Sequence, residues 1–157
     1  MRKLLFILFC FPFIFSGCKK DELPAPYISE NPSSQTEILL EVFGINNLDG
    51  NLAVAINNSS QQFSSNMESY RDTIIDVVST EMSIIINNIN TGIYAISIFH
   101  DEDEDNELDL GLFNIPQEGF GFSNNPSISF SQPDFNDCKF VIEEGQSVVI
   151  PVYLVYL

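Results

Sequence analysis

A dense run of carboxylates near the middle of the chain is the feature whose residue types and spacing could do chemistry. Seven of the nine residues from Asp101 to Asp109 are acidic. Such a density of like charge repels itself unless a cation lies among the carboxylates. Oxygen ligands at alternate positions of a loop are how a chain wraps Ca²⁺. The run therefore predicts a calcium site, and the alternative is a solvated acidic turn. The aspartates at positions 1, 3, 5 and 9 are Asp101, Asp103, Asp105 and Asp109.

Other positions of this loop either agree with the calcium hypothesis or depart from the usual pattern of a calcium loop. Glu107, at position 7, is expected to offer its backbone carbonyl, and Leu108 to hold the loop against the core. Asn106 stands at position 6, where Gly is typical, but Asn tolerates the left-handed backbone of a sharp turn. Position 12 is Leu112, so the bidentate Glu of a helical EF-hand is missing. We expect an EF-hand-like loop of the extracellular kind, with a dissociation constant of roughly 10⁻⁴ to 10⁻³ M.

His100 is the only histidine and precedes the acidic run. A hydrolase that used His100 with Asp101 or Asp103 is the catalytic alternative. However, the sequence shows no serine or cysteine nucleophile motif. One histidine among carboxylates is also a poor zinc set. We therefore expect no enzyme activity, and we expect His100 to end a strand and orient the loop.

The elements that position this loop are predicted to be strands. Apolar residues alternate with polar ones, and turn residues such as Asp49-Gly50 separate the segments. The only candidate helix is short, within 59–70. Several strands of six to nine residues predict an all-β fold, an antiparallel β-sandwich. The expected strands are 37–43, 52–56, 74–78, 82–89, 93–99, 140–142 and 148–156.

The N-terminus has the pattern of an export signal. Two basic residues precede twelve uncharged residues, 4–15, and Ser16-Gly17-Cys18 follows. This end resembles a lipobox, which predicts a lipoprotein signal peptide over 1–17 and an acyl anchor on Cys18 that holds the protein to a membrane. An ordinary signal peptide is the alternative. Three prolines within 19–36 predict that 18–36 is a flexible acylated tether, with the domain over 37–157.

The charges after Cys18 bear on localisation. Lys19-Lys20-Asp21-Glu22 resembles the signal that directs lipoproteins of Bacteroidetes type to the outer face of the outer membrane. We expect an outer membrane lipoprotein, with surface exposure left open. The net charge of −16 excludes nucleic acid as a partner. The cysteine at position 138 stands in an apolar stretch and is expected to be a core residue.

A second candidate site is the loop 115–126. Phe120 and Phe122 could stack a sugar ring or grip a peptide, with Asn124 and Asn125 as polar donors. This predicts an accessory domain that recognises carbohydrate or an envelope protein. The alternative is that the rings cover one end of the sandwich while the polar side chains bond the loop's own backbone.

Four pieces of the chain carry a resemblance to known proteins, namely 92–96, 100–103 with 108–109, 115–125 and 133–137. Together they resemble a named group of exported bacterial proteins, the domain-of-unknown-function 2141 family. With the strands before it, the resemblance runs from about residue 38 to the C-terminus. It implies a β-sandwich of prealbumin-like or immunoglobulin-like type and no established activity. The chain departs from the family at residues 104–106, 114 and 138.

Overall fold

The computed structural model describes residues 27–30, 36–64, 68–128 and 131–157. The predicted signal peptide 1–17, the lipidation site Cys18 and most of the predicted tether lie outside these residues. Among the described residues, no helix has the length and apolar character needed to cross a membrane.

Strands dominate the described part of the chain. The strands are β1 (Tyr27–Glu30), β2 (Glu37–Phe43), β3 (Asn51–Asn57), β4 (Arg71–Asp76), β5 (Glu81–Asn87), β6 (Gly92–Asp101), β7 (Phe120–Phe122), β8 (Phe140–Ile142) and β9 (Gln146–Tyr153). The helical segments are α1 (Ser60–Ser64), η1 (Leu112–Asn114) and α2 (Phe135–Cys138).

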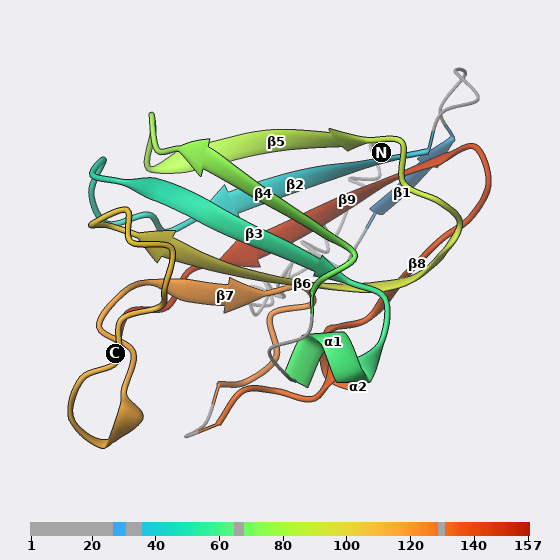
Figure 1. Cartoon of the computed structure of the whole chain (residues 1–157). Coiled ribbons are helices and arrows are strands. Elements are labelled where there is room, and N and C mark those ends of the chain that lie inside the picture. The colour runs from blue at the N-terminus through green and yellow to red at the C-terminus, as the bar shows by residue number, and fades with distance from the viewer. Residues whose placement is uncertain (1–26, 31–35, 65–67, 129–130) are drawn as a thin grey trace, which may run out of the picture.

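The strands form two facing sheets (Figure 1). The first has the order β1-β9-β2-β5. The second has the order β4-β3-β6-β7, with β8 also paired to β6. The predicted all-β sandwich is confirmed. One pair departs from the antiparallel expectation, because β2 and β9 run parallel. Parallel strands cannot be joined by a tight turn, and residues 44–145 separate these two along the chain.

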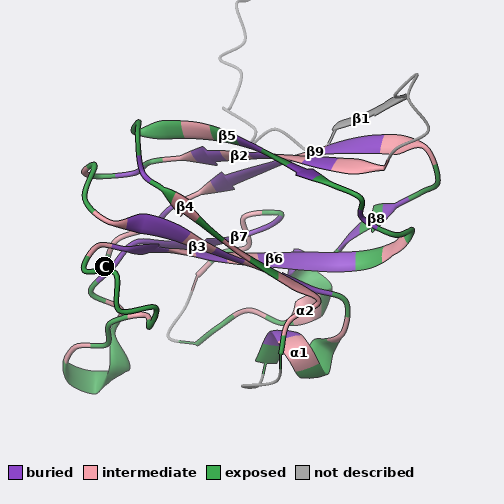
Figure 2. Cartoon of the chain, turned by 45° about the horizontal axis from the view of Figure 1, so that its top comes forward, coloured by how far each residue is buried: buried purple, intermediate pink, exposed green. Residues whose placement is uncertain are grey.

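Buried residues of both sheets form one apolar core, and Figure 2 shows the buried stretches of these strands. On β2, Ile38, Leu40 and Val42 are fully buried, while the residues between them are half-buried. Because successive side chains of a strand point to opposite faces, this alternation places one face of β2 in the core. The same rule puts Leu52, Val54 and Ile56 of β3 in the core. The opposite face of β3 therefore lies on the outside of the second sheet.

The first strand lies where the sequence predicted a tether. Tyr27–Glu30 pairs antiparallel with residues 146–149 of β9. Regular structure therefore begins before Glu37. The nearby prolines, which favour an extended chain, do not prevent a short edge strand from pairing.

A second apolar cluster covers part of the outer face of the second sheet. Phe63 of α1 packs edge-on against Phe122 of β7 and against Phe135 of α2. Cys138, fully buried, belongs to the same cluster, which confirms the prediction of a core cysteine. The two short helices thus close one end of this face, and they lie at the opposite end from the loop that follows β6 (Figure 1).

Candidate functional site

The acidic loop begins at the end of β6, with Asp101 in a fully buried position. The loop folds back over its carboxylate. The amide of Asp105 donates to Oδ1 at 3.1 Å, and the amide of Asn106 donates to Oδ2 at 3.0 Å. Two residues of this turn have left-handed backbones, Glu104 with φ 65° and Asn106 with φ 65°. The expected left-handed turn at Asn106 is therefore confirmed, and it wraps the chain around the Asp101 carboxylate.

Three of the predicted ligands come together in this turn. Asp101, Asp103 and Asp105 each offer one carboxylate oxygen, and these oxygens lie within 4.8 Å of one another. The group could hold a metal ion. Asp109 is not part of this side-chain group. Glu107 was expected to offer its backbone carbonyl, which stays a prediction. The amide of Glu107 donates to Asp105 Oδ1 at 2.8 Å. Leu108 packs against the second apolar cluster, as predicted for a residue that holds the loop to the core.

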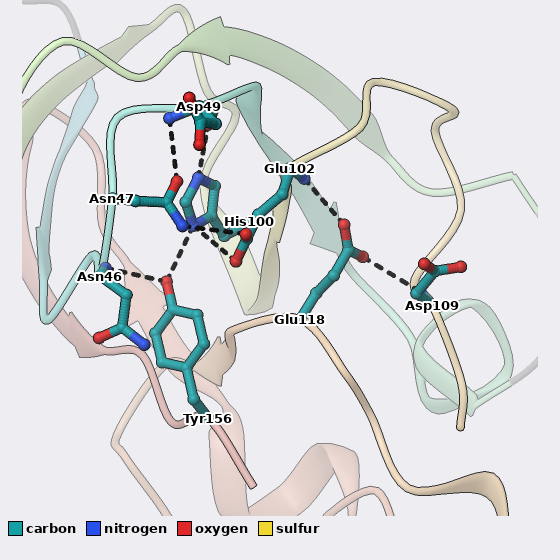
Figure 3. Close-up of polar contacts among 8 residues, drawn as sticks. All are labelled: Asn46, Asn47, Asp49, His100, Glu102, Asp109, Glu118 and Tyr156. Atoms are coloured by element: carbon teal, nitrogen blue, oxygen red, sulfur yellow. Dashed lines mark hydrogen bonds and ion pairs between the residues drawn. The ribbon is translucent and has the colours of Figure 1, made fainter. Parts of the chain in front are cut away.

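The structure adds Glu118, which the sequence reasoning missed. This side chain is 5% exposed, and its two carboxylate oxygens join the two ends of the loop (Figure 3). The amide of Glu102 donates to Oε1 at 2.8 Å, and the amide of Asp109 donates to Oε2 at 3.0 Å. No local pattern identifies this role, because Glu118 reaches the loop only through the tertiary fold.

His100 is fully buried beside the loop, and both of its ring nitrogens have protein partners (Figure 3). Nε2 lies 2.7 Å from the carbonyl oxygen of Asp49, which only accepts, so Nε2 carries a proton. Nδ1 lies 2.8 Å from the hydroxyl of Tyr156. The Asn46 amide donates to this hydroxyl oxygen at 3.2 Å, which leaves the hydroxyl hydrogen free to reach Nδ1. His100 thus joins the turn before β3 to the C-terminal segment.

Tyr156 is held in its protonated form. Burial raises the pKa of its hydroxyl, and the negative charges of Glu102 and Glu118 raise it further, against the lowering effect of the bond from Asn46. The hydroxyl therefore remains a donor toward His100.

A buried side-chain oxygen with no hydrogen-bond partner in the described part of the chain belongs to Asn51, the residue opposite Asp101 in the sheet. The register of β3 and β6 sets Asn51 directly opposite Asp101, so both side chains leave the same face of the sheet. Asn51 is buried, and its Oδ1 atom has no hydrogen-bond partner among the described residues. Gly50, with φ 62°, allows this close approach, because a Cβ there would lie 1.9 Å from the Asp101 carbonyl oxygen.

Among the described residues, no Lys or Arg side chain neutralises the negative charge of the acidic loop. Arg71 and Lys139 are the basic residues in those ranges. Arg71 donates to the carbonyls of Asn87 and Asn88, and Lys139 donates to Asn136. In the same ranges His100 Nδ1 lies 3.8 Å from Glu102, but this nitrogen accepts from Tyr156 and carries no proton, so it forms no ion pair. The carboxylates of the turn therefore face one another without a protein cation.

The asparagines of the second candidate loop bind backbone. The side-chain amide of Asn124 donates to the carbonyls of Asp137 and Lys139. Asn125 donates to the Pro151 carbonyl at 2.8 Å and accepts from the Tyr153 amide at 2.9 Å. β1 pairs with residues 146–149 of β9, so Pro151 and Tyr153 lie beyond that pairing. Asn125 gives these two residues the backbone hydrogen bonds that a neighbouring strand would otherwise make.

The phenylalanines of that loop line a large groove instead. Phe120 and Phe122 form β7 and are mostly buried in the second apolar cluster. They contribute to a groove of about 1120 Å³ on the outer face of the second sheet. We call this space the outer groove. Ala55 of β3 and Ser97 of β6 also line it, as do residues of α1 and of the loop 108–116.

The model of one protein family matches residues 40–150 of the chain. These residues include the acidic loop, Glu118 and β7. No curated protein and no solved structure matches the chain. The chain therefore belongs to the family described as uncharacterized protein conserved in bacteria, the domain-of-unknown-function 2141 family.

Proposed function

We propose that the protein is a non-catalytic binding or structural module of the cell envelope whose acidic loop is organised by Ca²⁺. The observation that carries this proposal is the convergence of Asp101, Asp103 and Asp105, with oxygens within 4.8 Å of one another. In the proposal, an acyl chain on Cys18 anchors the module to the outer membrane.

The ligand chemistry favours a hard cation. All three side chains offer carboxylate oxygens, which Ca²⁺ prefers. Asp101 is fully buried and has only amide hydrogens as partners among the described residues. Burying a charge without an opposite charge is costly, and a bound cation removes that cost. The buried Oδ1 of Asn51 opposite Asp101 is a further oxygen that a cation can satisfy.

Thermal unfolding in EDTA and in increasing Ca²⁺ tests the proposal, with Mg²⁺ as the comparison ion. The sample is residues 19–157, which keeps every described strand. With a dissociation constant of roughly 10⁻⁴ to 10⁻³ M, 10 mM Ca²⁺ adds about 1.4–2.7 kcal/mol to the free energy of unfolding. This corresponds to an increase in Tm of roughly 5–12 °C.

Two matched variants locate the effect. Asp103→Asn removes one exposed carboxylate of the group and should abolish the Ca²⁺-dependent increase in Tm. Glu144→Gln removes an exposed carboxylate from the turn between β8 and β9 and should leave the increase unchanged. No increase at 10 mM Ca²⁺, or an equal increase in Mg²⁺, would make the run a solvated acidic turn.

Recognition of carbohydrate or of an envelope protein through residues 115–126 is the second candidate function. The observation in its favour is that Phe120 and Phe122 line the outer groove. The side chains of Asn124 and Asn125 are already bonded to backbone, so we assign them no ligand contact. Binding of soluble glycans that Phe113→Ala weakens, at unchanged Tm, would support this function, because exposed Phe113 lines the same groove.

A further inference from the structure

The outer groove differs in chemistry between its two ends. Near α1 it is lined by polar side chains, including Asn57 and Gln62. Glu68 and Asp72 also lie at this end, and among the described residues that line the groove they carry the only charged side chains. Both are acidic, and the whole chain has a net charge of −16. This end therefore favours a positive group and repels a negative one.

The other end is apolar and open to solvent. Leu110, Phe113 and Ile115 line it from the loop after β6, and Leu157 lines it from the C-terminus. Phe113 is 86% exposed, and its backbone has φ 64°. A left-handed backbone is unusual for an aromatic residue. Exposed apolar side chains gathered beside a groove are typical of a ligand-binding surface.

The floor of the groove offers side chains and no free backbone. It is formed by β3 and β6, which are each paired on both sides within the sheet. A peptide that binds by adding a strand needs unpaired N–H and C=O groups, and the paired strands of the floor lack them. The floor side chains are small, as at Ala55 and Ser97, or aromatic, as at Phe99.

We propose that the outer groove binds a single-chain amphiphile with a positively charged head group. The apolar chain lies over β7 and toward Phe113, and the head group lies beside Glu68 and Asp72. The volume of about 1120 Å³ is sufficient, because sites for drug-sized ligands occupy about 300–1,000 Å³. This inference goes beyond the proposed calcium function and does not depend on it.

Three dodecyl amphiphiles with the same chain provide the test. Their head groups are trimethylammonium, maltoside and sulfate, and each is used below its critical micelle concentration. Isothermal titration calorimetry on residues 19–157 measures affinity, and thermal unfolding shows whether binding stabilises the fold. We expect the trimethylammonium compound to bind most tightly and to raise Tm. Equal affinity for all three, tightest binding of the sulfate, or a lowered Tm would overturn the proposal.

Variants at each end separate the two contributions. Glu68→Gln combined with Asp72→Asn should weaken trimethylammonium binding by about 3–10-fold, as expected for partly exposed ion pairs, and should leave maltoside binding unchanged. Phe113→Ser should weaken binding of both. Ile85→Ser, at an exposed position on the other sheet, is the matched control. If Phe113→Ser and Ile85→Ser had the same effect, binding would be a general property of the surface and the proposal would fail.

Discussion

Replacement of Glu118 by glutamine tests whether this one side chain holds the acidic loop closed. The glutamine has nearly the same shape but a single acceptor oxygen. One of the two amides, of Glu102 or Asp109, then faces an NH₂ group and loses its bond, and the remaining bond is no longer charge-assisted. A buried bond to a charged group contributes about 1.5–3 kcal/mol, and a neutral one contributes about half as much. We therefore expect the free energy of unfolding to fall by about 2–4 kcal/mol.

An opposing effect has to be separated in the assay. Glu118→Gln also removes one negative charge from beside a dense acidic run, which relieves repulsion. Because salt screens such repulsion, urea unfolding is measured in low salt and in about 0.5 M NaCl, and the loss should be larger in high salt. Amide hydrogen exchange should show faster exchange at Glu102 or Asp109. Glu144→Gln controls for the change of charge. A loss below about 0.5 kcal/mol in high salt, with unchanged exchange at both amides, would refute the role assigned to Glu118.

Three further outcomes follow from the structure. Burial, with the charges of Asp137 and Asp134, raises the thiol pKa of Cys138 from 9.0 to about 12, so the unfolded chain loses this proton first and stability falls as pH rises through this interval. Urea unfolding at pH 8.0–10.5 measures how steeply the free energy of unfolding falls with pH. In Cys138→Ala this slope should be shallower than in the unchanged protein by up to about 1.4 kcal/mol per pH unit. Equal slopes would contradict a buried, protonated thiol. Asn125→Ala should cost about 1–3 kcal/mol more than Asn88→Ala in the same assay, because both residues have left-handed backbones but only Asn125 bonds to β9; equal losses would assign the effect to the backbone alone. Asn51→Ala should reduce the Ca²⁺-dependent increase in Tm while changing Tm in EDTA little, and an equal change in both conditions would make Asn51 purely structural.

Local alternation accounts for the strands that were predicted well. The bounds of β2 and β8 agree with the expected ranges, because buried residues alternate with half-buried or exposed ones along each strand. β4 begins three residues earlier than predicted, at Arg71. Its register with β3 decides which of two adjacent isoleucines enters the core, so Ile75 packs inward and Ile74 is exposed. A run of apolar residues does not specify that choice.

The features that the sequence did not reveal depend on pairing between distant segments. β7 is three residues long and lies in a glycine-rich segment that resembles a loop. The turn around Asp101 was predictable, because its carboxylates are spaced along one short segment. Glu118 reaches the loop from another segment by its side-chain bonds, and strand register sets Asn51 opposite Asp101. Spacing along the chain contains no information about such approaches.

The order of strands in the first sheet also constrains when the protein can fold. β9 lies between β1 and β2, although it is the last strand to be synthesised. Glu37 pairs with Ser147 across 110 positions of the chain. Closing such long loops is slow relative to forming local contacts. Until residues 146–153 leave the ribosome, β2 can pair with β5, but β1 and β2 have no strand between them, so the first sheet cannot be completed. The topology thus delays completion of the fold until the synthesis of β9 ends.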